Sequence, residues 1–159
     1  MTQKSMSVLA RIIIIMFALL GVVLFGFAVP LFGADVVADN PEFSSWYAPW
    51  LVFIELMLFP CYAVLVLAWR ITSTIRAGKA FCMRNSVRFK AASLLALITS
   101  AYFFAGNIVF GLLNMSHPGV MLAALVVVFI GFAISAAAAI LSCMVRKAAM
   151  LQEESDLTI

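Results

Sequence analysis

This sequence contains few charged residues. Only 11% of its 159 residues are charged and 66% are hydrophobic, whereas soluble globular domains have about 25% charged and about 45–50% apolar residues. A soluble protein of this size exposes too much surface for so few charges to keep it in solution. The composition therefore excludes a soluble enzyme, a nucleic-acid-binding domain and a disordered chain, and it indicates an integral membrane protein.

Residues that usually carry catalysis or hold cofactors are also scarce. The three cysteines, Cys61, Cys82 and Cys143, form no Cys-x-x-Cys motif and are not placed for an outer disulfide, which argues against a thiol oxidoreductase. The single histidine, His117, falls in a predicted outer turn, so haem or zinc would lack a histidine ligand inside the membrane. Glycine-rich nucleotide-binding motifs are absent. We therefore expect no enzymatic activity, no cofactor and no metal.

Long runs without charge indicate where the chain crosses the membrane. They cover residues 12–34, 43–69 with one carboxylate, and 91–145. About 20 residues suffice for one helical span, and a turn-forming cluster from Asn114 to Gly119 divides the last run into two. The predicted fold is a single all-α integral membrane four-helix bundle, with spans of roughly 10–32, 48–70, 91–113 and 120–145. The first run is longer than the ~7–15 residues of a secretory signal core, so we expect an uncleaved helix.

The ten basic residues all lie on one side of the predicted bundle. They lie before span one, in the loop 70–90 and after span four. In the loop 33–47, by contrast, the only charged residues are Asp35, Asp39 and Glu42. The positive-inside rule therefore places both termini and the 70–90 loop in the cytoplasm, with short loops outside. The three outer carboxylates are expected to form a solvated surface, with a weak cation site as the alternative.

Glu55 is the one carboxylate inside a predicted span. Inserting such a group at the membrane centre costs about 2.5–3.5 kcal/mol, which makes Glu55 a candidate functional residue. Pro60 follows one turn later and predicts a kink, because it leaves the carbonyl near Leu56 without its amide partner. Two roles stay open: a neutral, hydrogen-bonded side chain that joins helices, or a proton- or cation-coupled site, with water access from the outer interface as a further alternative.

A row of polar residues on span three offers Glu55 a partner. Ser93, Ser100, Asn107 and Asn114 recur every seven residues and so share one helix face. Asn107 falls near the depth of Glu55. We therefore predict that Glu55 meets Asn107 across the interface of spans two and three, with Ser100 on the same face.

The loop 70–90 is a second candidate site. Span two is predicted to continue as a helix to Ala77 and to stop at Gly78, and a second helix is predicted to begin near Cys82. The loop has six basic residues and no acidic one. The simplest explanation of these basic residues is that they set the membrane topology and contact anionic lipid headgroups. The more specific hypothesis is that the loop is a docking platform for an acidic cytoplasmic partner or for the chain's own tail. Its candidate residues are Arg76, Gly78, Lys79, Phe81, Arg84 and Arg88.

The tail 146–159 is a third candidate, because it lies on the same predicted face as the basic loop. Short tails are usually solvated ends, but this one could be captured in a partner groove. Its candidate residues are Glu154, Asp156, Leu157, Thr158 and Ile159. In span four, Gly131, Ser135 and Ala139 are spaced by four, and we expect this stripe of small residues to allow close helix packing within the bundle or across a homodimer.

Several of these motifs resemble those of a bacterial membrane family, known as domain of unknown function 2975. The resemblance rests on Ala77-Gly78-Lys79-Ala80-Phe81 with the basic helix after it, on His117-Pro118-Gly119, and on the ending from Glu154 to Ile159. It implies a multi-pass protein of the bacterial inner membrane without an established activity. Family members often have Ser or Thr after Phe81, where this chain has Cys82-Met83-Arg84, so we expect a less well capped helix there.

The function predicted from these features is that of a non-enzymatic regulatory or partner-binding membrane protein, working through its basic loop and acidic tail. Members of the family are often encoded beside a small helix-turn-helix regulator, so the resemblance suggests such a protein as the cytoplasmic partner. We expect contacts with the bilayer and its anionic lipids, but no direct nucleic-acid binding. The alternative is a small proton-coupled exporter or accessory transporter subunit that uses Glu55, as a homodimer. A purely structural, lipid-interacting protein is a third class.

Overall fold

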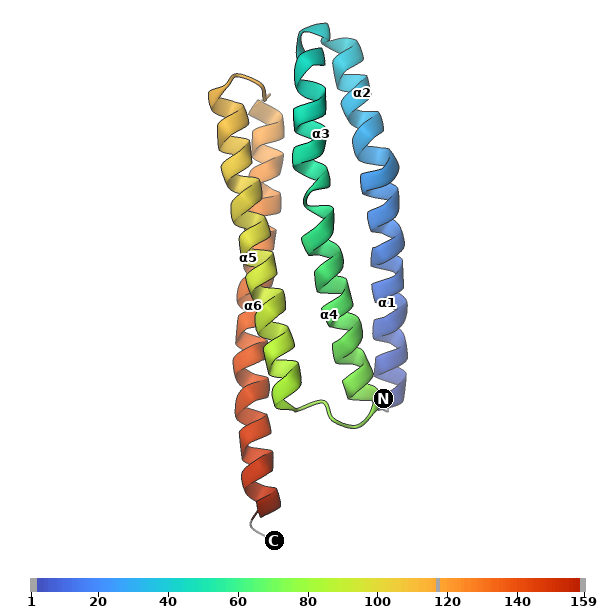
Figure 1. The fold of residues 1–159 in the computed structure, drawn as a ribbon, viewed down its shortest axis with the longest axis vertical. Helices are drawn as coiled ribbons and strands as arrows, with labels where there is room; N and C mark the ends of the chain where they lie inside the picture. The colour runs from blue at the N-terminus through green and yellow to red at the C-terminus, as the bar shows by residue number, and fades with distance from the viewer. Residues whose placement is uncertain (1–2, 117, 158–159) are drawn as a thin grey trace.

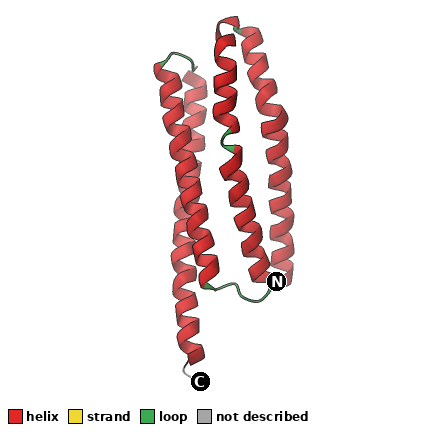
Figure 2. Cartoon of the chain, in the orientation of Figure 1, coloured by secondary structure: helices red, strands yellow, loops and turns green. Residues whose placement is uncertain are grey.

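The computed structural model describes residues 3–116 and 118–157, which form four long helical rods without a β-strand (Figures 1 and 2). Each rod is long and apolar enough to cross a membrane, which confirms the predicted all-α four-helix membrane fold. The first rod joins α1 (Gln3–Val23), a π-helical segment η1 (Leu24–Ala28) and α2 (Val29–Asp39). The second joins a 3-10 helix η2 (Pro41–Trp46), α3 (Tyr47–Glu55) and α4 (Leu58–Arg76). The third and fourth are α5 (Met83–Leu112) and α6 (Pro118–Leu157).

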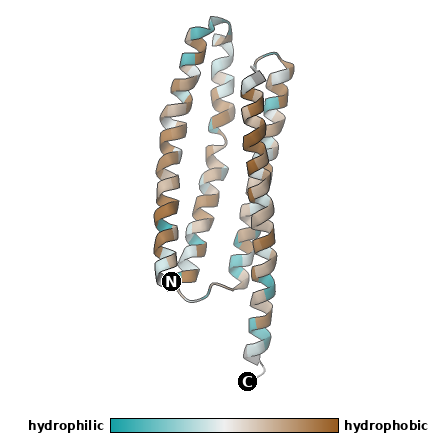
Figure 3. Ribbon diagram, turned by 180° about the vertical axis from the view of Figure 1, so that it is seen from behind, coloured by the Kyte–Doolittle hydropathy of each residue, from teal (hydrophilic) through white to brown (hydrophobic). Residues whose placement is uncertain are grey.

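The two ends of the bundle differ in charge. We call the end at which α1 begins, α4 and α5 connect and α6 finishes the basic end, because all ten Lys and Arg residues belong to it by sequence. The opposite end, where α2 meets η2 and α5 meets α6, is the acidic end. Between them, hydrophobic residues dominate the rods (brown in Figure 3), and many apolar side chains of α1 are exposed on the outside of the bundle, as lipid-facing residues must be.

The π-helical segment lies just before Pro30. The amide of Val29 donates to the carbonyl of Leu24, five residues earlier, so the first rod continues through a position at which proline lacks an amide donor. A π-bulge is a known way for a helix to absorb such an irregularity. The first rod therefore stays continuous from residue 3 to residue 39.

Two helices end in the same kind of turn. Gly78 follows α4 with a φ of 76°, and the amides of Lys79 and Gly78 donate to the carbonyls of Thr74 and Ile75. This Schellman pattern confirms the prediction that span two stops at Gly78. Asn114 closes α5 in the same way with a φ of 54°, since Met115 bonds back to Phe110 and Asn114 to Gly111.

The helices α4 and α5 each contact two other rods. The helix α5 packs along α6 and also contacts α3 and α4, and α4 packs along α1. On α6 the less exposed positions, apart from Ala148, repeat at intervals of four and three residues: 124, 128, 131, 135, 138, 142, 145 and 149. This is the heptad spacing of a helix pair wound along a narrow seam. Its members on α6 are mostly Ala, Ser and Gly, so the two backbones approach closely.

Candidate functional site

The polar row of α5 faces α6. Ser93 and Ser135 exchange hydrogen bonds, each hydroxyl donating to the other residue's backbone carbonyl at 2.9 Å. Ser86 and Ser142 repeat the arrangement at 2.9 and 2.8 Å. The shared face of Ser93 and Ser100 was predicted correctly, but the expectation that it meets span two was wrong. A seven-residue period defines a face without saying which neighbouring helix that face meets.

Ser100 and Gly131 form the next step of the seam. The hydroxyl of Ser100 donates to the carbonyl of Ala96 in its own helix and lies where a Cβ on Gly131 would be. Gly131 and Ser135 therefore allow the close approach that was expected within the bundle. Ala139, in contrast, is exposed. Within the bundle the stripe at intervals of four does not extend to Ala139, because the seam alternates steps of three and four and passes through Ala138 and Ser142. Packing of Ala139 across a homodimer stays a prediction.

Glu55 does not meet Asn107. The amide of Asn107 donates to the carbonyl of Phe103 in its own helix at 2.8 Å, and no hydrogen bond or ion pair joins the Glu55 side chain to any part of the chain that the structure describes. Glu55 is half-buried and is the last residue of α3. Asn107 lines a small cavity with Phe53 and Ile54 of α3, but its amide bonds within its own helix and Glu55 does not line that cavity.

The predicted kink is present one residue beyond Glu55. The helix breaks between α3 and α4 (Figure 2), and the amide of Met57 donates to Ile54 in place of Phe53. The carbonyl of Phe53 is instead bonded by the Tyr102 hydroxyl of α5 at 3.2 Å. The Phe53 ring lies against Gly106 and stacks on Phe103 at 5.8 Å between centroids. These contacts hold the broken helix on α5, and the tyrosine that compensates the break was missed by sequence reasoning.

A buried asparagine organises the basic loop. Asn85 is fully buried, and its amide nitrogen donates to the carbonyl of Ala80 at 3.0 Å. Its amide oxygen accepts from the Thr74 hydroxyl at 3.0 Å and from the Arg88 guanidinium at 3.1 Å. Arg88 also donates to the Arg70 carbonyl at 2.8 Å. Neither Asn85 nor Thr74 was a candidate. The sequence feature that could have identified Asn85 is its place as the third residue of α5, a helix that begins without a good capping residue.

The start of α5 is uncapped, as predicted. Cys82 takes the cap position with an extended backbone, but its side chain makes no capping hydrogen bond, and the first turn contains no acidic residue. The first amides of a helix carry a partial positive charge when no side chain or ligand accepts from them. Arg84, in the same first turn, adds a full positive charge.

Most of the predicted loop residues are on the surface. Arg76, Gly78, Lys79 and Arg84 are exposed, and the Phe81 ring is 58% exposed. The side chains of the three basic residues make no hydrogen bond or ion pair within the described chain. Arg88 differs, because its guanidinium donates hydrogen bonds to Asn85 and to the Arg70 carbonyl. The basic end therefore presents a positive surface without an internal acidic partner for Arg76, Lys79 and Arg84.

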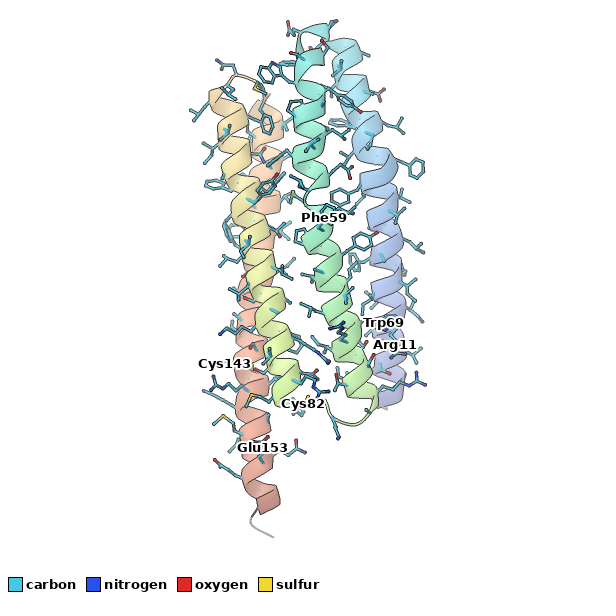
Figure 4. The ribbon with its side chains drawn as sticks, viewed as in Figure 1. Arg11, Phe59, Trp69, Cys82, Cys143 and Glu153 are labelled. Atoms are coloured by element: carbon cyan, nitrogen blue, oxygen red, sulfur yellow. The ribbon has the colours of Figure 1, made fainter. Side chains whose placement is uncertain are left out.

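The tail continues α6 beyond the rest of the bundle. The helix has 40 residues, about 60 Å, which is twice the ~30 Å of a hydrocarbon core. Its last buried residue is Ala149, and from Met150 to Ser155 every side chain is exposed. Figure 4 places Glu153 on this protruding part. Glu154 is exposed there too. The structure describes only the backbone of Asp156 and Leu157, and Thr158 and Ile159 lie outside the described residues, as does His117.

Arg11 connects the first two rods at the basic end. Its guanidinium donates to the Ser73 hydroxyl at 3.0 Å and lies 4.7 Å from the centre of the Trp69 ring, and Figure 4 shows the two side chains together. A cation over an indole face is attractive, and more so when little water is present. Arg11 was predicted only as a topogenic charge. In the structure it also packs α1 onto α4.

The cysteines and the outer carboxylates form no chemical centre in the described residues. Cys61, Cys82 and Cys143 are free thiols. No group of three His, Cys, Asp or Glu side chains is arranged to hold a metal ion within residues 3–116 and 118–157.

Comparison with known proteins identifies the family. Residues 31–159 match the model of a family described as "Protein of unknown function (DUF2975)". The chain belongs to the DUF2975 family. It is also 32% identical over 117 residues, 71% of this chain and 73% of the relative, to a protein described as "Uncharacterized membrane protein YoaS" from Bacillus subtilis strain 168. No solved structure matches the chain.

The DUF2975 match covers the features described above, with one exception. It begins in α2 and includes the helix break, the basic loop, the serine seam and α6. Most of the first rod, with Arg11, precedes the matched residues. The surface formed by the loop and the protruding helix therefore lies within the residues that match the family model.

Proposed function

We propose that this protein is a non-enzymatic regulator that sits in the bacterial inner membrane and binds an acidic cytoplasmic partner through its basic end. The observation that carries the proposal is the protrusion of α6. A helix that continues about two turns beyond its last buried residue, Ala149, with Met150 and Leu151 exposed at 44% and 67%, gains little from packing on its own chain. The positive-inside rule supports a cytoplasmic location for this end.

The basic residues of the loop 70–90, in contrast to Glu153 and Glu154 on the protrusion, favour a partner with an acidic surface. Arg76, Lys79 and Arg84 have no internal acidic partner, and the uncapped amides of α5 lie in the same loop. Phe81 adds an exposed ring among these charges. A basic rim around apolar side chains favours association with an acidic surface that also offers an apolar pocket. A helix-turn-helix regulator, suggested by the family resemblance, is one candidate for this partner.

Cross-linking in native membranes tests the proposal. A photoreactive residue in place of Phe81 should capture a specific cytoplasmic protein, and Arg84→Glu or removal of residues 156–159 should each reduce that capture severalfold while membrane insertion is unchanged. Glu42→Lys, a charge reversal at the acidic end, is the matched control and should leave capture intact. Capture of lipid alone, or unchanged capture in both variants, would overturn the proposal in favour of topogenic and lipid-binding charge.

A further inference from the structure

An aromatic pocket lies at the acidic end of the bundle. It has a volume of about 490 Å³, within the range of pockets that hold drug-sized molecules. Its walls come from α2, η2, α3, the end of α5 and the start of α6. The aromatic residues that line it are Phe32, Phe43, Trp46, Tyr47, Trp50 and Phe110.

Specific contacts hold two of these rings, those of Tyr47 and Trp50, in place. The Tyr47 hydroxyl donates to the Pro30 carbonyl at 3.1 Å, and this bond ties the start of α3 to α2. Gly33 is buried, and a Cβ at that position would lie 2.7 Å from the Tyr47 ring and 2.9 Å from the Trp50 ring. The absence of a side chain at Gly33 is therefore what lets the two rings pack across α2. The part of the pocket formed by Tyr47 and Trp50 is therefore set by the fold, whereas Phe32 and Trp46 are more exposed, at 58% and 43%.

The pocket continues toward the middle of the bundle. A second hollow of about 200 Å³ shares Trp50 and Phe110 with it and reaches Asn107. Polar groups are few: Asn40 and Ser116 line the larger pocket. An occupant would therefore be held mainly by apolar and aromatic contact.

The formal charges around the pocket are all negative. Asp35 and Asp39 are exposed residues of α2 and Glu42 is an exposed residue of η2; each is next to a lining residue in the sequence, and none of the three lines the pocket itself. Residues 12–69 and 91–145, which supply every wall, contain no lysine or arginine. Aromatic faces attract cations through their quadrupole, most strongly when water is excluded, and a rim of one sign concentrates ions of the opposite sign.

From this combination we propose that the pocket binds a lipophilic organic cation, a quaternary ammonium or phosphonium centre that carries apolar groups. The rings of Trp46 and Trp50 contact the cation and its apolar groups, and the carboxylates of Asp35, Asp39 and Glu42 raise its local concentration. A neutral molecule is not attracted by the carboxylates of Asp35, Asp39 and Glu42, and an anion is repelled by them. The proposal is independent of the partner-binding function, which concerns the opposite end.

Tetraphenylphosphonium is a suitable probe, because tetraphenylborate has nearly the same shape and the opposite charge. The full-length protein is placed in nanodiscs of neutral phosphatidylcholine, and binding is measured by equilibrium dialysis after subtraction of empty discs. We expect saturable binding of the phosphonium and none of the borate. Equal saturable binding of both ions, or no phosphonium binding above that of empty discs, would overturn the proposal and indicate a pocket filled by lipid chains.

Three variants localise the binding. Trp50→Ala should weaken phosphonium binding about tenfold, which lies between the values for an exposed and a fully desolvated cation–π contact. Trp46→Ala, at a residue 43% exposed, should weaken it about threefold and is less disruptive to folding. If the three carboxylates attract the phosphonium, added salt weakens its binding. The triple change Asp35→Asn, Asp39→Asn, Glu42→Gln should remove this salt dependence of phosphonium affinity.

Trp69→Phe, at the basic end, is the control and should bind the phosphonium as the unmodified chain does. Unchanged affinity in both Trp46→Ala and Trp50→Ala would place the phosphonium elsewhere and refute the assignment to this pocket.

Discussion

Ser93 and Ser135 each donate their hydroxyl proton to the other's backbone carbonyl at 2.9 Å. The hydroxyl oxygens lie 3.3 Å apart, so the two helices meet with no larger side chain between them. In a membrane the hydrophobic effect does not drive helices together, and association depends on close packing and interhelical hydrogen bonds. The repetition of this pair at Ser86 and Ser142 makes the α5–α6 hairpin the most directly bonded part of the bundle.

The seam predicts a graded response to substitution. Ser93→Ala should lower the free energy of unfolding by about 0.6 kcal/mol, the typical value for an interhelical hydrogen bond in a membrane, whereas Gly131→Leu should separate the helices and cost several times more. Ala139→Leu, at an exposed position, should be neutral. Thermal unfolding in detergent measures all three. A larger loss for Ala139→Leu than for Gly131→Leu would contradict the seam.

The Asn85 network predicts a loosened loop when its amide is removed. Asn85→Ala leaves buried partners unsatisfied, which costs about 1–3 kcal/mol, so the half-buried Cys82 should react faster with a maleimide in a chain lacking Cys61 and Cys143. Asn40→Ala is the control, because that amide bonds only one turn back in its own rod. An unchanged rate of Cys82 labelling would show that Asn85 does not hold the loop.

The compensated helix break predicts coupling between Tyr102 and Pro60. Tyr102→Phe frees the Phe53 carbonyl and should destabilise the bundle by about 0.5–1.5 kcal/mol. In a Pro60→Ala background the helix can close its own hydrogen bonds, so the same change should cost less. A double-mutant cycle on unfolding free energies measures the difference. Additive effects would mean that the Tyr102 bond and the break are unrelated.

Glu55→Gln separates the proposed function from the transporter alternative. The Glu55 side chain lines neither of the two cavities at the acidic end, so we expect normal insertion and unchanged partner capture. Efflux or drug-resistance assays with matched expression levels provide the measurement. A loss of efflux with normal expression would establish Glu55 as a proton carrier and favour the exporter.

Some features could be predicted because they depend on neighbouring residues. The stop at Gly78 follows from the need for a positive φ, the weak start of α5 follows from Cys82, and the break follows from Pro60. Partner helices were predicted less well. Asn107 was placed against Glu55 of span two, the seam was not traced through Ala138 and Ser142, and Asn85 and Tyr102 were not recognised. Each of these depends on the rotation of one helix relative to another.

The amino-acid pattern was enough to predict a membrane protein with four helical spans, because uncharged runs of about 20 residues or more fit the length of a transmembrane helix, in which every backbone hydrogen bond is made within the segment. It also placed all the basic residues at one end and three carboxylates at the other. The tertiary structure decided which faces meet. It paired Ser93 with Ser135, left Glu55 without Asn107, and gathered the rings of Trp46 and Trp50 into one pocket. Those outcomes rest on helix rotation and close packing, which a hydrophobic pattern does not specify when lipid and protein interior are equally apolar.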